Sequence, residues 1–410
     1  MHKLLHSLAP SFLATEVRRI VRKHLRRLRR IDQRVVTLEP EGKPVGRALL
    51  SYIIDPLLLP PDREVPHSHT HFWETRTLAQ ALAAAGYTVD AISWTHHGYV
   101  PPQPVDLLID VRMNLERLAP LVPNAVKVLH ADTAHHSFHN PAQEARLSAL
   151  QTRRGVAIRP QKRLPVNQAA EHADLISVLG NGFTQGTYAF AGKPMVHLPV
   201  SVPRTYPWPE GKDFDRVRRH FLWFGSGGLV HKGLDLVLEA FAGLPDHHLT
   251  VCGPIRSERD FEREYFRELY QTPNIETRGW VDVAGEDFQT LCRDTLGLVY
   301  PSCSEGGGSS ALTCMHAALV PLLNREVSVD VEPDTGVLLE DLSVEGLRRA
   351  VVEVSERDAG SLEAMARGAW SFARAHHTKE RFETKAEKFA ELLATGAWRD
   401  LSVGERAHEL

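Results

Sequence analysis

Short runs of apolar residues alternate with longer amphipathic segments along most of the chain. In the first half, runs rich in leucine and β-branched residues predict strands at residues 47–54, 87–93, 105–111, 126–131, 173–180 and 194–200. Such continuous runs suit a parallel sheet that is covered on both faces. Residues 72–86 predict a helix that ends at Gly86. Because strands alternate with helices, this half predicts an α/β domain of doubly wound type.

The same pattern begins again near residue 220. Apolar runs predict strands at residues 220–226, 248–253, 275–280, 296–302 and 320–324. An apolar stripe at helical spacing predicts a helix after the first of these strands, through Leu234, Val237, Leu238 and Phe241. The proline-rich residues 202–213 between the two series predict a linker.

We therefore expect an α/β protein with two Rossmann-like, doubly wound parallel-sheet domains that face each other across a cleft. The expected divisions are a basic amphipathic helix (1–31), a first domain (32–205), a second domain (206–375) and a C-terminal helix and tail (376–410). Open sheets of this type bind ligands beyond the carboxyl ends of their strands, so both domains should present loops to the cleft.

Composition narrows the class of protein. The chain has 410 residues, of which 43% are hydrophobic and 24% charged, and a net charge of -3. These values are ordinary for a globular protein of two domains and do not indicate nucleic-acid binding. No apolar run reaches the length of about 18 residues that a membrane span requires. The four cysteines form no C-x-x-C pair, which predicts a reducing, cytoplasmic compartment and no structural zinc.

One segment departs from this average composition. Residues 15–31 carry eight lysines and arginines between Arg18 and Arg30, above apolar residues at helical spacing. A basic amphipathic helix of this kind can lie on an anionic membrane surface. Alternatively, it packs on its own protein or on a partner, with a solvated charged face.

A glycine run after the strand at 296–302 is the first candidate for chemistry. Glu305 precedes three glycines, Ser309 and Ser310, and an apolar helical pattern follows. Either serine is suited to cap that helix. A strand, a glycine loop and a helix N-terminus together form an anion site, although the glycines could serve only a tight turn. Because Glu305 would repel a phosphate, we expect it to bind another part of the ligand, such as sugar hydroxyls.

A second glycine loop should supply positive charge. Residues 224–233, "FGSGGLVHKG", follow a predicted strand and place Lys232 just ahead of a helix. Lysine is a compact charge that suits phosphate binding. An exposed surface lysine is the alternative, but the strand-to-helix junction favours the binding role. A nucleotide-sugar contains both of the groups that these two loops would bind, a diphosphate and sugar hydroxyls.

At this point the second half resembles a known family. The stretch "FGSGGLVHKGLDLVLEAF", the turn Gly279-Trp280-Val281, the run from Pro301 to Gly308 and "DTGVLLED" (334–341) are similar to motifs of GT-B-fold glycosyltransferases, especially the retaining family 4. The resemblance covers about residues 190–397, and in the first domain it is chiefly one of element order. It implies a nucleotide-sugar-binding second domain, an acceptor-side first domain and no metal cofactor.

The resemblance also implies roles for individual residues. Lys232 and the backbone of Gly306 to Ser310 would stabilise the leaving diphosphate, and Glu305 would orient the sugar. The residues expected to bind the donor are Gly227, Gly228, Gly279, Trp280, Gly306, Gly307, Gly308, Ser309, Ser310 and Thr313.

Two positions depart from the family pattern. Thr313 stands where the family usually has a second Glu that contacts the ribose, and a hydroxyl is the weaker partner. Gly227-Gly228 stand where the family commonly has an Arg, which leaves His231 and Lys232 as the possible cations of that loop.

The first domain offers polar residues for the acceptor and the transferred sugar. Near the start of the 72–86 helix, the alternating histidines of "PHSHTHFWE" (66–74) would share a face in a strand, and His69 and Thr70 are the acceptor-side candidates. A zinc site there is the less favoured reading, because nothing nearby completes a ligand set. The stretch "VLHADTAHHSF" (128–138), at the end of the predicted strand 126–131, supplies three candidates for the transferred sugar, His130, Asp132 and His135, with Asp132 favoured. His130 could equally end the strand as a buried residue.

The glycine-punctuated loop 179–187 adds Asn181 or Thr184 on the acceptor side. The sequence thus predicts a retaining glycosyltransferase that uses a nucleotide-diphosphate sugar and a glycan, lipid-linked or small-molecule acceptor. It would be cytoplasmic, either free or at the inner face of a membrane. The alternatives are a non-catalytic nucleotide-sugar or glycan-binding protein and an epimerase or phosphorylase with the same fold.

Overall fold

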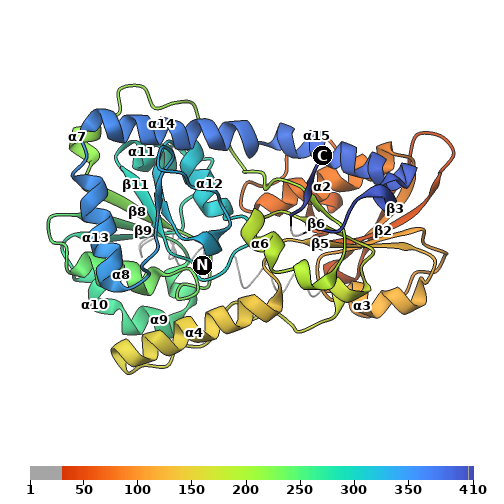
Figure 1. The fold of residues 1–410 in the computed structure, drawn as a ribbon, viewed down its shortest axis with the longest axis horizontal. Coiled ribbons are helices and arrows are strands. Elements are labelled where there is room, and N and C mark those ends of the chain that lie inside the picture. Colours follow the sequence, from red (N-terminus) through yellow and green to blue (C-terminus); the bar gives the residue numbers. More distant parts are fainter. Residues whose placement is uncertain (1–29, 405) are drawn as a thin grey trace, which may run out of the picture.

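The computed structural model describes residues 30–404 and 406–410 and contains two separate β-sheets with helices packed around them (Figure 1). The basic helix predicted over residues 15–31 falls almost wholly outside the described residues, since only its last two positions are included. A short 3-10 turn, Ile31–Gln33, begins at its last position.

The first sheet holds eight strands of the described chain in the order β1-β3-β2-β4-β5-β6-β7-β14. The edge strand β1 is antiparallel to β3, and every other neighbouring pair is parallel. Strands β3, β4 and β6 are buried along their whole length, as their continuous apolar runs predict. The bounds are β1 (Val35–Leu38), β2 (Gly46–Tyr52), β3 (Tyr87–Ser93), β4 (Leu107–Asp110), β5 (Val126–Ala131), β6 (Leu175–Val178), β7 (Met195–His197) and β14 (His408–Glu409).

The second sheet is parallel throughout the described residues and has the order β10-β9-β8-β11-β12-β13. Counted along the chain this is 3-2-1-4-5-6, the strand order of a Rossmann fold. The predicted doubly wound fold is therefore confirmed. The bounds are β8 (His220–Phe224), β9 (His248–Cys252), β10 (Ile275–Gly279), β11 (Gly297–Tyr300), β12 (Val320–Leu323) and β13 (Val337–Leu338).

Helices connect the strands and also join the two halves of the molecule. Helix α14 packs on α12 beside the second sheet, and α15 packs on α2 beside the first, so the chain returns to the first domain at its end (Figure 1). The helices are α2 (Thr70–Ala84), α3 (Asn114–Leu118), α4 (His136–Arg154), α5 (Ala169–His172), α6 (Gly182–Gly186), α7 (Phe214–Val217), α8 (Leu234–Ala242), α9 (Arg259–Glu264), α10 (Phe266–Tyr270), α11 (Glu286–Arg293), α12 (Ser309–His316), α13 (Val344–Ser355), α14 (Ala359–His376) and α15 (Lys379–Thr395).

In each sheet, the connections first add strands on one side of a central strand and then on its other side, so the direction reverses once. The reversal lies between β2 and β4 in the first sheet and between β8 and β11 in the second. Loops diverge at such a point and leave a crevice beyond the carboxyl ends of the strands. The two predicted site loops, 225–233 and 301–308, follow β8 and β11 and so flank the crevice of the second sheet.

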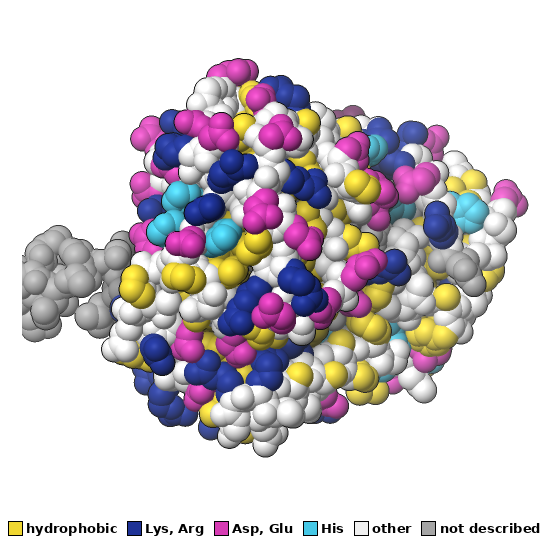
Figure 2. All heavy atoms as spheres, turned by 60° about the vertical axis from the view of Figure 1, so that its left-hand side comes forward, with side chains coloured by type: hydrophobic (Ala, Val, Ile, Leu, Met, Phe, Trp, Pro, Cys, Tyr) yellow, Lys and Arg dark blue, Asp and Glu magenta, His cyan; other side chains and the backbone are white. Residues whose placement is uncertain are grey.

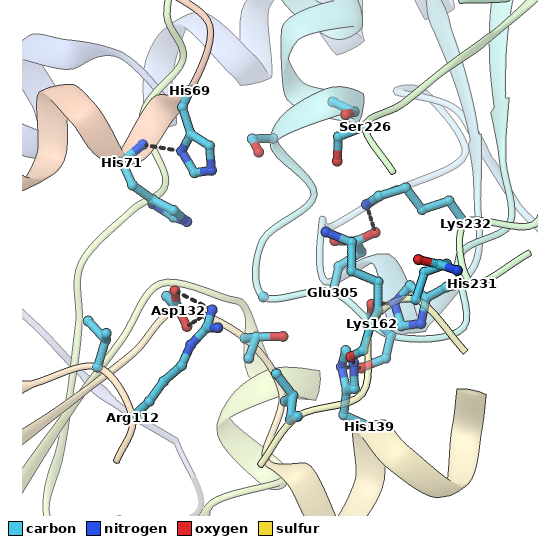
Figure 3. A pocket seen from close by; sticks show the side chains of 18 of the residues that line it. His69, His71, Arg112, Asp132, His139, Lys162, Ser226, His231, Lys232 and Glu305 are labelled. Carbon is cyan, nitrogen blue, oxygen red and sulfur yellow. Dashed lines mark hydrogen bonds and ion pairs between the residues drawn. The ribbon is translucent and has the colours of Figure 1, made fainter. Parts of the chain in front are cut away.

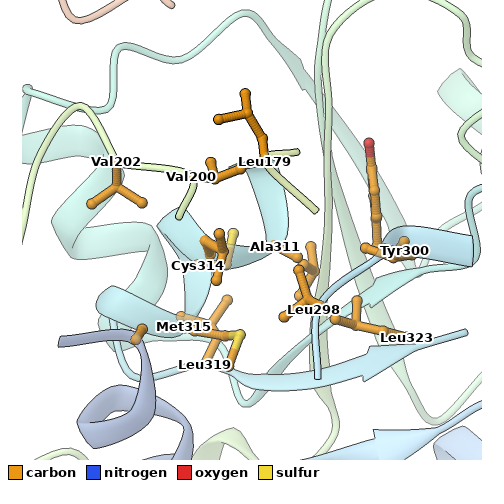
Figure 4. Packing of buried hydrophobic residues seen from close by; sticks show 14 of the residues in the cluster. Leu179, Val200, Val202, Leu298, Tyr300, Ala311, Cys314, Met315, Leu319 and Leu323 are labelled. Atoms are coloured by element: carbon orange, nitrogen blue, oxygen red, sulfur yellow. The ribbon is translucent and has the colours of Figure 1, made fainter. Parts of the chain in front are cut away.

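A buried apolar cluster joins the two halves behind these loops. Leu179 and Val200, which follow β6 and β7, belong to the same cluster as Ala311, Cys314 and Met315 of α12 (Figure 4). All five side chains are at most 3% exposed. Because a close-packed core tolerates little displacement, this cluster fixes the start of α12 relative to the first sheet.

The charged side chains on the surface are distributed as the nearly balanced net charge of -3 suggests (Figure 2). Acidic and basic side chains are interspersed across the face that Figure 2 shows. None of the helices in the described part of the chain is both long and apolar enough to span a membrane. All four cysteines are buried and free of disulfide bonds.

Candidate functional site

The loops at the two reversal points face each other across one pocket of about 420 Å³. The second domain contributes Lys232, Glu305, Ser309 and Ser310 to its wall, and loops of the first domain form the opposite wall (Figure 3). The volume lies within the range of small-molecule and cofactor sites, and such sites commonly occur between domains. The pocket is therefore the candidate site.

Lys232 and Glu305 contact each other in this pocket. The Lys232 ammonium donates to Glu305 Oε1 at 2.5 Å and to the Tyr300 hydroxyl at 2.7 Å. Tyr300 and Ser302 also donate to Oε1, both at 2.9 Å. The three bonds to the carboxylate all use Oε1, and the other oxygen, Oε2, has no hydrogen-bond donor among the described residues.

This pairing explains the charge state of Glu305. Burial alone would raise the pKa of its carboxyl, but the charge of the Lys232 ammonium and the hydrogen bonds from Lys232 and Tyr300 lower the pKa to about 2. Glu305 is therefore an anion at neutral pH, and its carboxylate is held in a fixed orientation in the pocket wall. The sequence predicted Glu305 and Lys232 for different parts of a ligand, whereas the structure also pairs them with each other.

A carboxylate of the same domain holds the glycine loop 225–233. The Glu258 carboxylate accepts hydrogen bonds from the backbone N–H groups of Gly228 and Leu229. These two donors are thus already occupied. Gly227 and Gly228 do not reach the pocket wall, which Ser226 of the same loop does line.

His231 is not a cation of this loop. Burial lowers its pKa to about 3, Nε2 donates to the Ser304 carbonyl at 2.6 Å, and Nδ1 lies 3.3 Å from Cys303 Sγ. The neutral ring holds the loop of Glu305 in place. Of the two predicted cations, only Lys232 is charged.

The three glycines after Glu305 serve close packing in different ways. A Cβ on Gly306 would lie 2.2 Å from the Asp132 carbonyl oxygen of the first domain, and one on Gly307 would lie 2.3 Å from Val200. Gly308 has a φ of +50° and is the N-cap of α12. The prediction that Ser309 or Ser310 caps this helix is wrong, because both serines lie inside its first turn, where they line the pocket.

Three other predicted donor residues lie away from the pocket wall. The Thr313 hydroxyl donates to the Ser309 carbonyl at 2.7 Å, one turn earlier in α12. Gly279 ends β10 with a φ of +77°, and the Trp280 side chain beside it is 54% exposed. None of the three is among the described residues that form the wall.

Asp132 of the first domain lies on the wall opposite Glu305. Its carboxylate accepts from Arg112 Nη2 at 3.1 Å, and the Arg112 guanidinium stacks over Trp94 at 4.7 Å. Burial opposes ionisation, but the charge of Arg112 lowers the pKa of Asp132 below its usual range. The pair presents a fixed carboxylate to the pocket.

The histidine segment 66–74 starts a helix rather than a strand. His69 is the N-cap of α2, Thr70 is buried in its first turn, and both His69 and His71 line the pocket. His71 Nδ1 donates to Glu74, whose other oxygen accepts from the Ser201 backbone at 2.9 Å. His69 thus acts as a helix cap and His71 as the ion-pair partner of Glu74. The described residues contain no group of three or more His, Cys, Asp or Glu suited to hold a metal ion.

The remaining first-domain candidates lie behind or beside the pocket. His130 is fully buried, with a pKa lowered to about 4 by burial, and bonds Ser177 at 2.8 Å. His135 is the N-cap of α4. Asn181 donates to Asp330 at 2.7 Å and Thr184 to Ser328 at 2.7 Å, so both connect the first domain to the second.

The sequence reasoning did not identify several residues that line the pocket or support it. Arg112 and Lys162 line it, and the buried Glu74 holds His71. Arg112 follows β4, one of the two strands at the reversal point, and that position could have identified it. Lys162 lies in an irregular segment after α4, and no sequence signal points to it.

Comparison with known proteins identifies the architecture. No protein-family profile and no curated protein matches the sequence. Among solved structures, sucrose-phosphate synthase from Thermosynechococcus elongatus has a TM-score of 0.60 at 16% identity, over 87% of this chain and 100% of that one. A glycosyltransferase from Rickettsia africae has a TM-score of 0.56 at 12% identity, over 85% and 99%.

A third similar structure is HepE from Anabaena, solved in complex with UDP and glucose. Its TM-score is 0.54 at 12% identity, over 85% of this chain and 100% of that one. Likeness at such identities establishes the fold alone. The chain therefore has the GT-B architecture, two Rossmann-like domains facing a cleft, as the sequence predicted.

Proposed function

We propose that this protein is a glycosyltransferase that moves a sugar from a nucleotide-diphosphate sugar to a glycan, lipid-linked or small-molecule acceptor. The observation that carries the proposal is the pairing of Lys232 with Glu305 at the reversal point of the second sheet, inside the pocket between the domains. The GT-B fold supports it, and so does the presence of UDP and glucose in the HepE structure.

The second domain would bind the donor. The Lys232 ammonium and the first turn of α12, with Ser309 and Ser310, would stabilise negative charge that develops on the leaving diphosphate. Glu305 Oε2 would accept hydrogen bonds from the sugar hydroxyls. Because Tyr300 and Ser302 fix the carboxylate before a ligand arrives, little reorganisation is needed during the reaction.

The first domain would bind the transferred sugar and the acceptor. Asp132 and His69 lie on the wall opposite Glu305, where a carboxylate and a ring nitrogen can bind hydroxyl groups. Enclosure between the domains would exclude water, which otherwise competes with the acceptor.

We further propose that transfer retains the anomeric configuration, as the motif resemblance implies. Arg112 holds Asp132 and Lys232 holds Glu305, so neither carboxylate forms a hydrolase-like acid and base pair with the other. Proton NMR of the first product formed would test this part. A product with the opposite anomeric configuration to the donor would contradict it.

The first experiment is calorimetric titration of the purified protein with UDP, GDP, ADP and dTDP. We expect one nucleotide to bind near micromolar Kd, about -8 kcal/mol, and Lys232→Ala to remove that binding. Lys388→Ala, which changes an exposed lysine of α15, is the control. If the wild type bound none of the four, the proposed function would be wrong.

Turnover separates a transferase from a binding protein. Donor consumption with a panel of sugar acceptors should be lost in Glu305→Ala while the variant keeps a cooperative thermal transition. Glu340→Gln, an exposed carboxylate of the same domain, should leave the rate unchanged. Full activity of Glu305→Ala would contradict the proposed role of Glu305. Nucleotide binding by the wild type without any turnover would indicate a non-catalytic binding protein.

A further inference from the structure

Residues 155–168, which follow α4, run along the pocket between the domains. Gln161, Lys162, Arg163 and Leu164 all line its wall. This segment has no regular secondary structure, so its conformation must be held by side chains.

Buried side chains of α4 hold the backbone at Lys162. His139 Nε2 donates to the Lys162 carbonyl at 2.7 Å, and the Lys162 N–H donates to Gln143 Oε1 at 3.1 Å. Asn140 bonds both the N–H and the carbonyl of Leu164 at 2.9 Å. The three α4 residues are each at most 7% exposed. Lys162 is therefore fixed by a dedicated polar network rather than placed by chance on a loose loop.

The same network reaches the loop of Glu305. His139 Nδ1 accepts from the Ser304 hydroxyl at 3.0 Å, and Ser304 precedes Glu305. The position of the Lys162 backbone is thus connected to the position of Glu305 in the other domain.

The Lys162 side chain passes over Gly228 of the first glycine loop. A Cβ on Gly228 would lie 2.6 Å from Lys162 Cγ, and the backbone there has a φ of +89°, which favours glycine. Figure 3 shows the Lys162 amine on the same side of the pocket as Glu305 and Lys232. The glycine therefore leaves room for a lysine that comes from the first domain.

Charge makes this lysine different from its neighbours. Lys232 pairs with Glu305, Arg112 with Asp132, and Arg163 with Glu144. Among the described residues, Lys162 has no ion-pair partner. Burial and the nearby charges of Lys232 and Arg112 lower its pKa, while the longer-range attraction of Glu305 and Glu258 raises it. A partly buried ammonium that makes no ion pair within the protein is suited to bind an anionic ligand.

We propose that Lys162 of the first domain and Lys232 of the second together bind the diphosphate of the nucleotide. This inference rests on the proposed function and adds a residue and a requirement to it. The charge of Lys232 is balanced by Glu305, so Lys162 supplies the net positive charge that a diphosphate needs. The donor site is then complete only when both domains contribute.

The test compares diphosphate and monophosphate binding in variants of one position. Lys162→Met keeps the apolar stem over Gly228 and removes the charge, Lys162→Arg restores a charge, and Arg159→Ala changes an exposed cation of the same segment. Calorimetry would use the diphosphate among UDP, GDP, ADP and dTDP that binds the wild type, and the monophosphate of the same base.

We expect Lys162→Met to weaken the diphosphate about tenfold or more, and the monophosphate less. Lys162→Arg should restore most of the affinity, and Arg159→Ala should bind as the wild type does. The thermal midpoint of ligand-free Lys162→Met should not fall, since a repulsion with Lys232 is removed. If Lys162→Met bound the diphosphate as tightly as the wild type does, this inference would be overturned. The proposed function would stand, because it is tested by the loss of binding in Lys232→Ala. If the wild type bound no diphosphate, both this inference and the proposed function would be overturned.

Discussion

At the scale of single residues, most charges of the pocket occur in pairs. Glu305 pairs with Lys232, Asp132 with Arg112, and Glu74 with His71. In a partly desolvated site, a paired carboxylate keeps its charge and its orientation, whereas an unpaired one would take up a proton. The pairs therefore hold hydrogen-bond acceptors in place before a ligand binds.

The pair of His71 and Glu74 predicts a pH dependence of stability. Burial works against the charged ring, but the charge and hydrogen bond of Glu74 raise the pKa of His71 above its ordinary 6.5, with Asp132 adding to this and Arg112 opposing it. The stabilisation by His71 is thus fully present below that ordinary value and is lost as the pH rises through the raised one. Glu74, whose pKa is lowered against the effect of burial, loses its stabilisation only when the pH falls below its ordinary 4.5.

We expect Glu74→Gln to lower the free energy of unfolding by about 3 kcal/mol near pH 6, and by progressively less toward pH 9. Urea denaturation across this range would measure the difference. Glu64→Gln, which breaks the more exposed pair with His67, should cost at most about 1 kcal/mol at any pH. A Glu74→Gln effect that stayed constant from pH 6 to pH 9 would contradict the assignment of a charged His71.

The sequence could identify Lys232 and Glu305 because each lies in a local motif of strand, glycine loop and helix. It could not identify their contact with each other, since 73 residues separate them. The pairing of Arg112 with Asp132 was missed for the same reason, because the two residues lie close only in the folded chain. Residue type and spacing predict which groups can do chemistry, whereas charge pairing depends on the tertiary fold.

At the scale of elements, the strands were predicted well and the start of α12 was not. β3 and β5 have the predicted bounds, and most other predicted strands begin or end one to three residues inside theirs. β2 begins one residue earlier than predicted, and β1, β13 and β14 were not predicted as strands. The helix cap failed because propensity favours serine, whereas the chain turns at Gly308 with a φ of +50° against Val327 and Val329. Packing around the loop, which the sequence pattern does not contain, decides where the helix begins.

The close contact of Gly306 with the first domain gives a prediction for this loop. A Cβ at this position would lie 2.2 Å from the Asp132 carbonyl oxygen and 2.3 Å from Thr133 Cα, which are backbone atoms that cannot rotate away. Gly306→Ala should therefore lower the free energy of unfolding by about 2 kcal/mol and reduce nucleotide affinity. Chemical denaturation and calorimetry would measure the two effects.

Gly186→Ala is the matched control for this substitution. Gly186 ends α6, and a Cβ there would meet no atom within 4 Å. Alanine favours a helix over glycine by up to about 1 kcal/mol, so the control should be neutral or stabilising. Equal stability of Gly306→Ala and the wild type would show that the domains can separate at this contact without cost.

At the scale of the whole molecule, segments of each domain extend onto the other. α15 packs on α2, β14 extends the first sheet beside β7, and the end of α4 contacts the second domain. The sequence predicted an amphipathic C-terminal helix but not the element on which it packs. A periodic apolar stripe shows that a face is buried, and the partner of that face depends on how the chain returns in space.

The end of α4 provides the last prediction. Arg153 Nη2 donates to Asp235 at 2.7 Å, and its Nε donates to Glu239 at 3.1 Å, both on α8 of the second domain. The Asp235 carboxylate is fully buried, so removing Arg153 would take away its ion-pair partner. We expect Arg153→Met to lower the free energy of unfolding by about 3 kcal/mol. Glu144→Gln, which breaks the exposed pair with Arg163 from the α4 side, should cost at most about 1 kcal/mol.

Arg153→Met should also weaken nucleotide binding, although Arg153 does not line the pocket. α4 carries His139 and Gln143, which hold the backbone of Lys162, so loosening the end of this helix would release Lys162 from its position. Urea denaturation and calorimetry on Arg153→Met and Glu144→Gln would measure both consequences. A destabilised Arg153→Met with unchanged diphosphate affinity would show that α4 joins the domains without positioning the site. Equal stability of the two variants would also contradict the role of α4 in joining the two domains.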